Sequence, residues 1–124
     1  MKIWSALALM LLYASAATAH HAEAAFDHHK LMSVQGTVKE FLWANPHSVV
    51  YLEVTGPGSQ TDVNVFECGS VQIMRRNGWT ASSLMPGDKV TIDYNPRRDK
   101  TPGGMLVAVT LADGKKLSWQ SSMP

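Results

Sequence analysis

The sequence predicts an all-β domain, and three observations support this fold class. After the first thirty residues, short segments alternate apolar and polar side chains, as strands do when successive side chains point to opposite faces. Clusters of glycine, proline, asparagine and aspartate separate these segments, and such clusters favour turns. One segment, beginning near residue 70, instead has the spacing of a short helix.

Six segments are predicted to be strands. They are residues 34–43, 48–55, 62–68, 89–94, 105–111 and 115–119. Asn45-Pro46-His47 ends the first strand, because proline cannot donate to a sheet ladder. Gly56-Pro57-Gly58-Ser59 gives a turn before the third strand, and Asp113-Gly114 gives a tight turn before the last.

The predicted helix follows the third strand. Ser70 suits its N-cap, Val71 and Met74 share one face, and Asn77-Gly78 ends it. Three strands, a helix and then further strands are the element order of a small OB-like Greek-key barrel, with one short helix between strands 3 and 4. A small β-sandwich is the alternative.

The first nineteen residues have the features of a secretory signal peptide. Lys2 supplies the positive start, residues 3–13 are almost entirely apolar, and Ala17-Thr18-Ala19 fits the small-residue pattern of signal peptidase. The apolar stretch is shorter than the ~20 residues of a membrane-spanning helix. We therefore expect a signal peptide at residues 1–19, a His-rich N-terminal arm at 20–32 and an OB-like β-barrel domain at 33–119.

The predicted export signal and the balance of charged residues limit which partners this protein can bind. Such a signal directs the chain to the periplasm, and no stable membrane insertion is expected after cleavage. The chain has 11 basic and 10 acidic residues, so losing Lys2 with the signal leaves 10 of each. This balance argues against nucleic acid, because binding to phosphates needs an excess of Lys and Arg. Cys68 is the only cysteine, and we expect it to be a small buried residue.

Five short motifs follow one another through the mature chain. They are His20-His21, Gly36-Thr37-Val38, Asn45-Pro46-His47, Arg75-Arg76-x-Gly78-Trp79 and Pro86-Gly87-Asp88. In this order they resemble an uncharacterised family of small secreted bacterial proteins, known only as a domain of unknown function. The resemblance implies export and one compact β-domain, and it implies no established activity.

The N-terminal histidines are the first candidates for chemistry. If cleavage follows Ala19, His20 carries a free α-amine and an imidazole, and these two nitrogens can chelate one copper ion. His21 and His47 can add imidazoles, and Glu67 can support the metal site with its carboxylate. Nitrogen ligands suit copper, nickel or zinc, and copper(II) is bound most tightly in the usual affinity order. The alternatives are that the paired histidines are solvated and that His47 only hydrogen-bonds a neighbouring carbonyl.

Glu67 has two interpretations. It falls in phase with Val63 and Val65, which would place a carboxylate on an apolar face, where it must be paired or bind a metal. It could instead be a solvated strand end or a partner of Arg75 or Arg76.

Other function classes have less support. The sequence has no nucleophile elbow, zinc-protease motif, CxxC pair or phosphate-binding glycine loop, so a non-enzymatic binding protein is expected. The competing hypothesis is a structural or adaptor domain that binds another cell-envelope protein or peptide through Trp43 and Tyr51. A small-ligand-binding barrel is a third option. Arg97, Arg98 and Lys100 form a small basic patch, which fits a solvated loop more simply than an anion site.

Overall fold

The computed structural model describes residues 24–120. The predicted signal peptide at 1–19 lies outside the described residues, as do His20 and His21. Within residues 24–120, no helix has both the length and the apolar character needed to cross a membrane.

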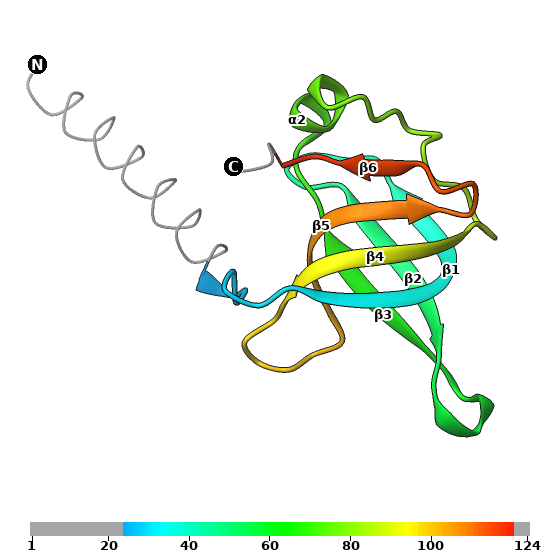
Figure 1. The fold of residues 1–124 in the computed structure, drawn as a ribbon. Helices are drawn as coiled ribbons and strands as arrows, with labels where there is room; N and C mark the ends of the chain where they lie inside the picture. Colours follow the sequence, from blue (N-terminus) through cyan, green and yellow to red (C-terminus); the bar gives the residue numbers. More distant parts are fainter. Residues whose placement is uncertain (1–23, 121–124) are drawn as a thin grey trace, which may run out of the picture.

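Six strands and the short helix α2 make up the barrel domain (Figure 1). In chain order the elements are β1 (Met32–Leu42), β2 (Val49–Thr55), the 3-10 turn η1 (Pro57–Ser59), β3 (Thr61–Glu67), α2 (Val71–Arg76), β4 (Lys89–Pro96), β5 (Gly103–Leu111) and β6 (Lys116–Ser118). The six predicted strands and the predicted helix are confirmed, with ends displaced by at most two residues. Because β4 and β5 are longer than predicted, the loop between them is shorter and covers residues 97–102.

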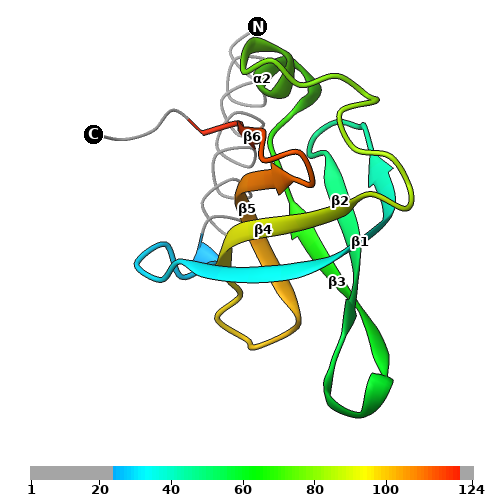
Figure 2. The same ribbon diagram turned by 45° about the vertical axis from the view of Figure 1, so that its right-hand side comes forward.

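Five of the strands close into a barrel. β1 pairs antiparallel with both β2 and β4, β2 pairs with β3, and β4 pairs with β5. A parallel pairing of β3 with β5 closes the ring, and β6 pairs with the C-terminal half of β5. The α2 helix lies over one end of the barrel, while the β2–β3 hairpin and the β4–β5 loop extend from the other (Figures 1 and 2). The predicted OB-like Greek-key barrel is therefore confirmed, and the chain does not form the alternative β-sandwich.

The barrel interior is filled by apolar side chains from all five barrel strands. They include Val38 of β1, Val50 and Leu52 of β2, Phe66 of β3, Ile92 of β4, and Leu106 and Val109 of β5, which are all fully buried. Met74 of α2 and the following Trp79 belong to the same buried cluster and close the helix end of the core. Burial of a side chain of this size contributes about 1.5–3 kcal/mol to stability, so this cluster is the main stabilising feature.

The junction of β3 and β5 requires two glycines. Gly103 pairs with Val65 and has a φ of +110°, a backbone conformation that residues with side chains rarely adopt. A Cβ at Gly103 would collide with the carbonyl oxygen of Val65, and one at Gly104 would collide with the carbonyl oxygen of Asn95. The two glycines therefore let β5 approach β3 and β4 closely enough to close the barrel.

Replacing Gly103 with alanine is expected to lower the free energy of unfolding by more than about 3 kcal/mol, because the left-handed backbone costs about 1–2 kcal/mol and the collision with Val65 adds to it. Gly58 is the matched control, because its φ is +79° but nothing lies within 4 Å of a Cβ built there. Gly58→Ala should therefore cost only the backbone contribution, about 1–2 kcal/mol. Urea unfolding followed by tryptophan fluorescence measures both losses. Equal losses would contradict the close approach at Gly103.

Candidate functional site

The loop between β1 and β2 holds His47 against the segment that follows β3. The backbone N–H of Ser48 donates to the carbonyl of Gly69 at 2.9 Å, and the N–H of Cys68 donates to the carbonyl of Ser48 at 2.8 Å. Since Cys68 directly follows Glu67, the structure brings two of the four predicted metal-site residues, His47 and Glu67, to neighbouring positions on adjacent segments.

The imidazole of His47 is exposed and has a defined hydrogen bond. Its Nδ1 lies 3.1 Å from the carbonyl oxygen of Cys68. A carbonyl oxygen only accepts hydrogen bonds, so Nδ1 carries the proton, and the Nε2 of the neutral ring keeps its lone pair. The hydrogen bond to a neighbouring carbonyl, which was the alternative to a ligand role for His47, is thus present, and it leaves the other ring nitrogen able to bind a ligand.

Asn45, two positions before His47, has a structural role that sequence reasoning missed. The Oδ1 of Asn45 accepts a hydrogen bond from the backbone N–H of Val71 at 3.0 Å, at the first residue of α2. Ser70 caps the same helix, as predicted, by accepting from the N–H of Ile73. The Asn45-Pro46-His47 motif therefore ties the β1–β2 loop to the start of α2.

Glu67 is partly exposed and forms an ion pair with a residue from a different part of the chain. Its carboxylate lies 3.8 Å from the guanidinium of Arg97, and one third of its side chain is exposed. Glu67 does share a face of β3 with Val63 and Val65, but the expectation that this face is buried is wrong, since Val63 is 40% exposed and the side chain that β3 buries in the core is Phe66. The structure therefore gives Glu67 a partner that sequence reasoning did not foresee.

The first described residues are fastened to the β4–β5 loop. Phe26 is 1% exposed, and the guanidinium carbon of Arg97 lies 5.0 Å from the centre of its ring. The backbone N–H of Arg98 donates to Ala25 at 2.9 Å, and the Arg98 Nε donates to Ala24 at 3.1 Å. Arg97 consequently lies between Phe26 and Glu67. A single aromatic residue within a polar stretch was the signal that could have revealed this anchor.

Not all of the predicted metal site can be located. His20 and His21 lie outside the described residues. Among residues 24–120, no three side chains of His, Cys, Asp or Glu gather closely enough to hold a metal ion. Within this part of the chain, the predicted metal-site residues are thus His47, whose imidazole is exposed, and Glu67, whose carboxylate is paired with Arg97.

The surface through which an adaptor domain would bind its partner is only half-exposed. Trp43 and Tyr51 are both half-buried. The ring of Trp43 contacts that of Phe41 edge to face at 5.8 Å and packs against the core. Part of the Trp43 side chain therefore packs against the barrel and helps to stabilise it. The adaptor hypothesis stays a prediction.

Fold and site together define a small closed barrel of OB type whose N-terminal arm is fastened to the β4–β5 loop. The chain belongs to a family of unknown function, DUF6152, whose model matches residues 8–120. This membership agrees with the uncharacterised domain that the sequence resembles, and it brings no activity with it. Comparisons with curated proteins and with solved structures gave no match.

Cys68 is expected to be inert toward the thiol reagent DTNB at pH 8 while the protein is folded. The residue is fully buried, as predicted, and burial together with the charge of Glu67 raises the pKa of its thiol far above the usual value. Little reactive thiolate is then present. The absorbance of the released dye should rise only after guanidinium chloride unfolds the chain, and rapid reaction of the folded protein would contradict this environment.

Proposed function

We propose that this protein is a periplasmic, non-enzymatic binding protein for a transition metal, with copper favoured over zinc and nickel. The observation that carries the proposal is the hydrogen bond from His47 Nδ1 to the carbonyl of Cys68. This bond orients an exposed imidazole and fixes its tautomer, with the lone pair of Nε2 available. Metal-binding histidines commonly donate their other ring N–H to a carbonyl or carboxylate in the same way.

The N-terminal arm supplies the other ligands in this proposal. His20 precedes Ala24 by four residues, so covalent geometry keeps the two within about 14 Å of each other. Ala24 is itself fixed by its hydrogen bond with Arg98. Arg97, which directly precedes Arg98, contacts both Phe26 of the arm and Glu67 of β3. This chain of contacts supports a site shared by the arm and the His47 end of β3.

The proposed ligand set has the chemistry of a copper(II) site. His20 provides its α-amine and its imidazole, and His21 and His47 provide two further imidazoles. These nitrogen donors bind copper(II) more tightly than nickel or zinc. Glu67 is held by Arg97, so its part in the proposal is to place negative charge near the cation rather than to bind it directly.

Copper(II) titration of the exported protein tests the proposal, after mass spectrometry has established that the chain begins at His20. Calorimetry should show one tightly bound copper per chain, and electron paramagnetic resonance should show nitrogen ligands. Acetylating the α-amine of His20 removes one of its two nitrogen donors, so the chelate is lost. We expect the affinity to fall at least about tenfold, which corresponds to about 1.4 kcal/mol.

A second variant addresses the barrel ligand. His47→Ala should weaken copper binding at least about tenfold, whereas His29→Ala, which removes another exposed imidazole, should have little effect. Binding that is equally strong in the wild type, the acetylated protein and His47→Ala would refute the proposed site.

A further inference from the structure

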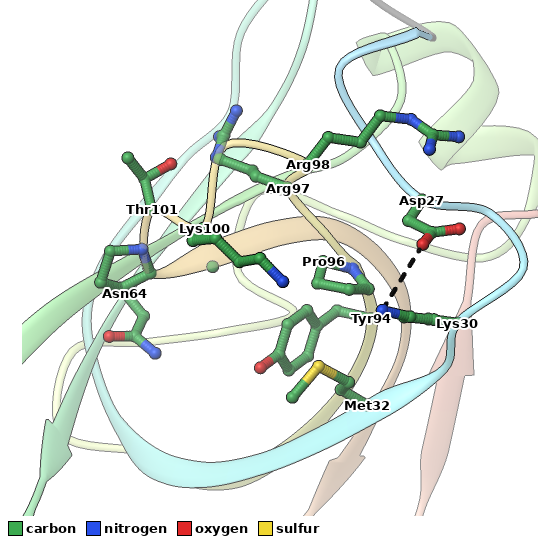
Figure 3. A pocket seen from close by; sticks show the side chains of 12 residues that line it. Asp27, Lys30, Met32, Asn64, Tyr94, Pro96, Arg97, Arg98, Lys100 and Thr101 are labelled. Carbon is green, nitrogen blue, oxygen red and sulfur yellow. Dashed lines mark ion pairs between the residues drawn. The ribbon is translucent and has the colours of Figure 1, made fainter.

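A pocket of about 380 Å³ lies between the N-terminal arm, the start of β1 and the β4–β5 loop (Figure 3). Its volume is within the range of small-molecule sites in proteins, near the lower end. Neither His47 nor Glu67, the two members of the proposed metal site that lie within residues 24–120, lines it.

Positive charge dominates the lining of this pocket. Four cationic side chains line it, against the single carboxylate of Asp27. Lys30 lies 3.9 Å from Asp27 in an exposed ion pair, and Lys100 forms no ion pair within residues 24–120. In Figure 3 the side chain of Lys100 extends toward Pro96, while Lys30 reaches the pocket from the arm. The two ammonium groups therefore approach the pocket from separate segments.

The other charged side chains near the pocket, those of Arg97, Arg98 and Asp99, already interact with other groups of the protein. Arg97 contacts Phe26 and Glu67, and the Nε of Arg98 donates to the arm backbone. Asp99 is in the same loop but does not line the pocket. The backbone N–H and the hydroxyl of Thr101 donate to its carboxylate, and these hydrogen bonds lower the pKa of Asp99. Lys100, which has no ion pair among residues 24–120, and Lys30, whose side chain is 62% exposed despite its ion pair with Asp27, are thus the cations best placed to meet a ligand.

Apolar surface and unpaired polar groups complete the lining. Tyr94 is 8% exposed, and its ring packs edge-on against Phe66 and lies next to Pro96 and Met32 (Figure 3). The Tyr94 hydroxyl points into the pocket and makes no hydrogen bond within the described part of the chain. The side-chain amide of Asn64, on β3, also lacks a partner among residues 24–120. A hydroxyl and an amide without partners at such a pocket can bond a ligand.

The walls of the pocket are fixed by hydrogen bonds. The Nδ2 of Asn95 donates to the carbonyl of Lys30 at 2.7 Å, and the N–H of Asp27 donates to the carbonyl of Pro96 at 2.9 Å. The N–H of Lys30 also donates to the carbonyl of Asp27 at 3.1 Å. Because the arm is already held in place, a ligand would not have to order it, and such preorganisation favours binding.

We infer that this pocket binds a small organic anion, namely a carboxylate or phosphate group attached to a flat apolar body. The anionic group lies between Lys30 and Lys100, and the apolar body lies on Met32 and Pro96. The hydroxyl of Tyr94 donates a hydrogen bond to the anion. Charge-assisted hydrogen bonds of this kind are stronger than neutral ones and give preference for an anion over a neutral analogue.

The test uses phenyl phosphate and benzoate as probes, with metal-free exported protein and amide resonances followed by NMR. Both probes should shift the resonances of residues 30–32 and 97–103. Benzyl alcohol, which has the ring without the charge, should bind at least about tenfold more weakly. Inorganic phosphate, which has the charge without the ring, should also bind more weakly than phenyl phosphate. Using metal-free protein separates this result from the copper experiment.

Matched variants test the assigned residues. Lys100→Gln should weaken phenyl phosphate binding about three- to tenfold, and Tyr94→Phe should weaken it while keeping the ring. Lys115→Gln is the control, because Lys115 is an exposed lysine that does not line the pocket. Equal affinity for benzyl alcohol or inorganic phosphate would overturn the inferred ligand class. Resonance shifts elsewhere, or an equal effect of Lys115→Gln, would overturn the site.

Discussion

The parallel pairing of β3 with β5 is the constraint on which the rest of the structure depends. It involves three residue pairs, from Val65–Gly103 to Glu67–Met105, and it turns an open sheet into a barrel. An open sheet would leave strand edges with unpaired backbone groups. Gly103 and Gly104 make the closure feasible, because a Cβ at either position would strike a backbone carbonyl of the neighbouring strand. The shape of the domain is therefore set by two residues without side chains.

That closure also determines what surrounds the β4–β5 loop. The loop ends at Gly103, so pairing β5 with β3 brings Arg97 within reach of Glu67. The same loop receives the N-terminal arm, whose Phe26 is buried against Arg97. One short loop thus connects the arm, β3 and the wall of the pocket. The metal hypothesis and the anion pocket both depend on it, although they use different side chains.

Alternation and turn residues predicted the strands well, and the case of Glu67 shows the limit of such patterns. A two-residue period tells which side chains share a face, but not which face is turned toward the core. Val63, Val65 and Glu67 do share a face of β3, yet the core takes Phe66 from the opposite face. The choice between the faces depends on how β2 and β5 flank the strand, which no segment of β3 can encode alone.

By itself, the sequence determined the order and approximate ends of the strands, the cap of α2 by Ser70 and the burial of Cys68. These features follow from local periods, turn chemistry and hydrophobicity, so they can be read from neighbouring residues. Only the tertiary structure decided that Arg97 pairs with Glu67, that His47 bonds the carbonyl of Cys68, and that a pocket forms between the arm and the β4–β5 loop. Each of these contacts joins residues at least twenty positions apart. Closure of the barrel brings them together, and that closure is a property of the whole chain rather than of any one segment.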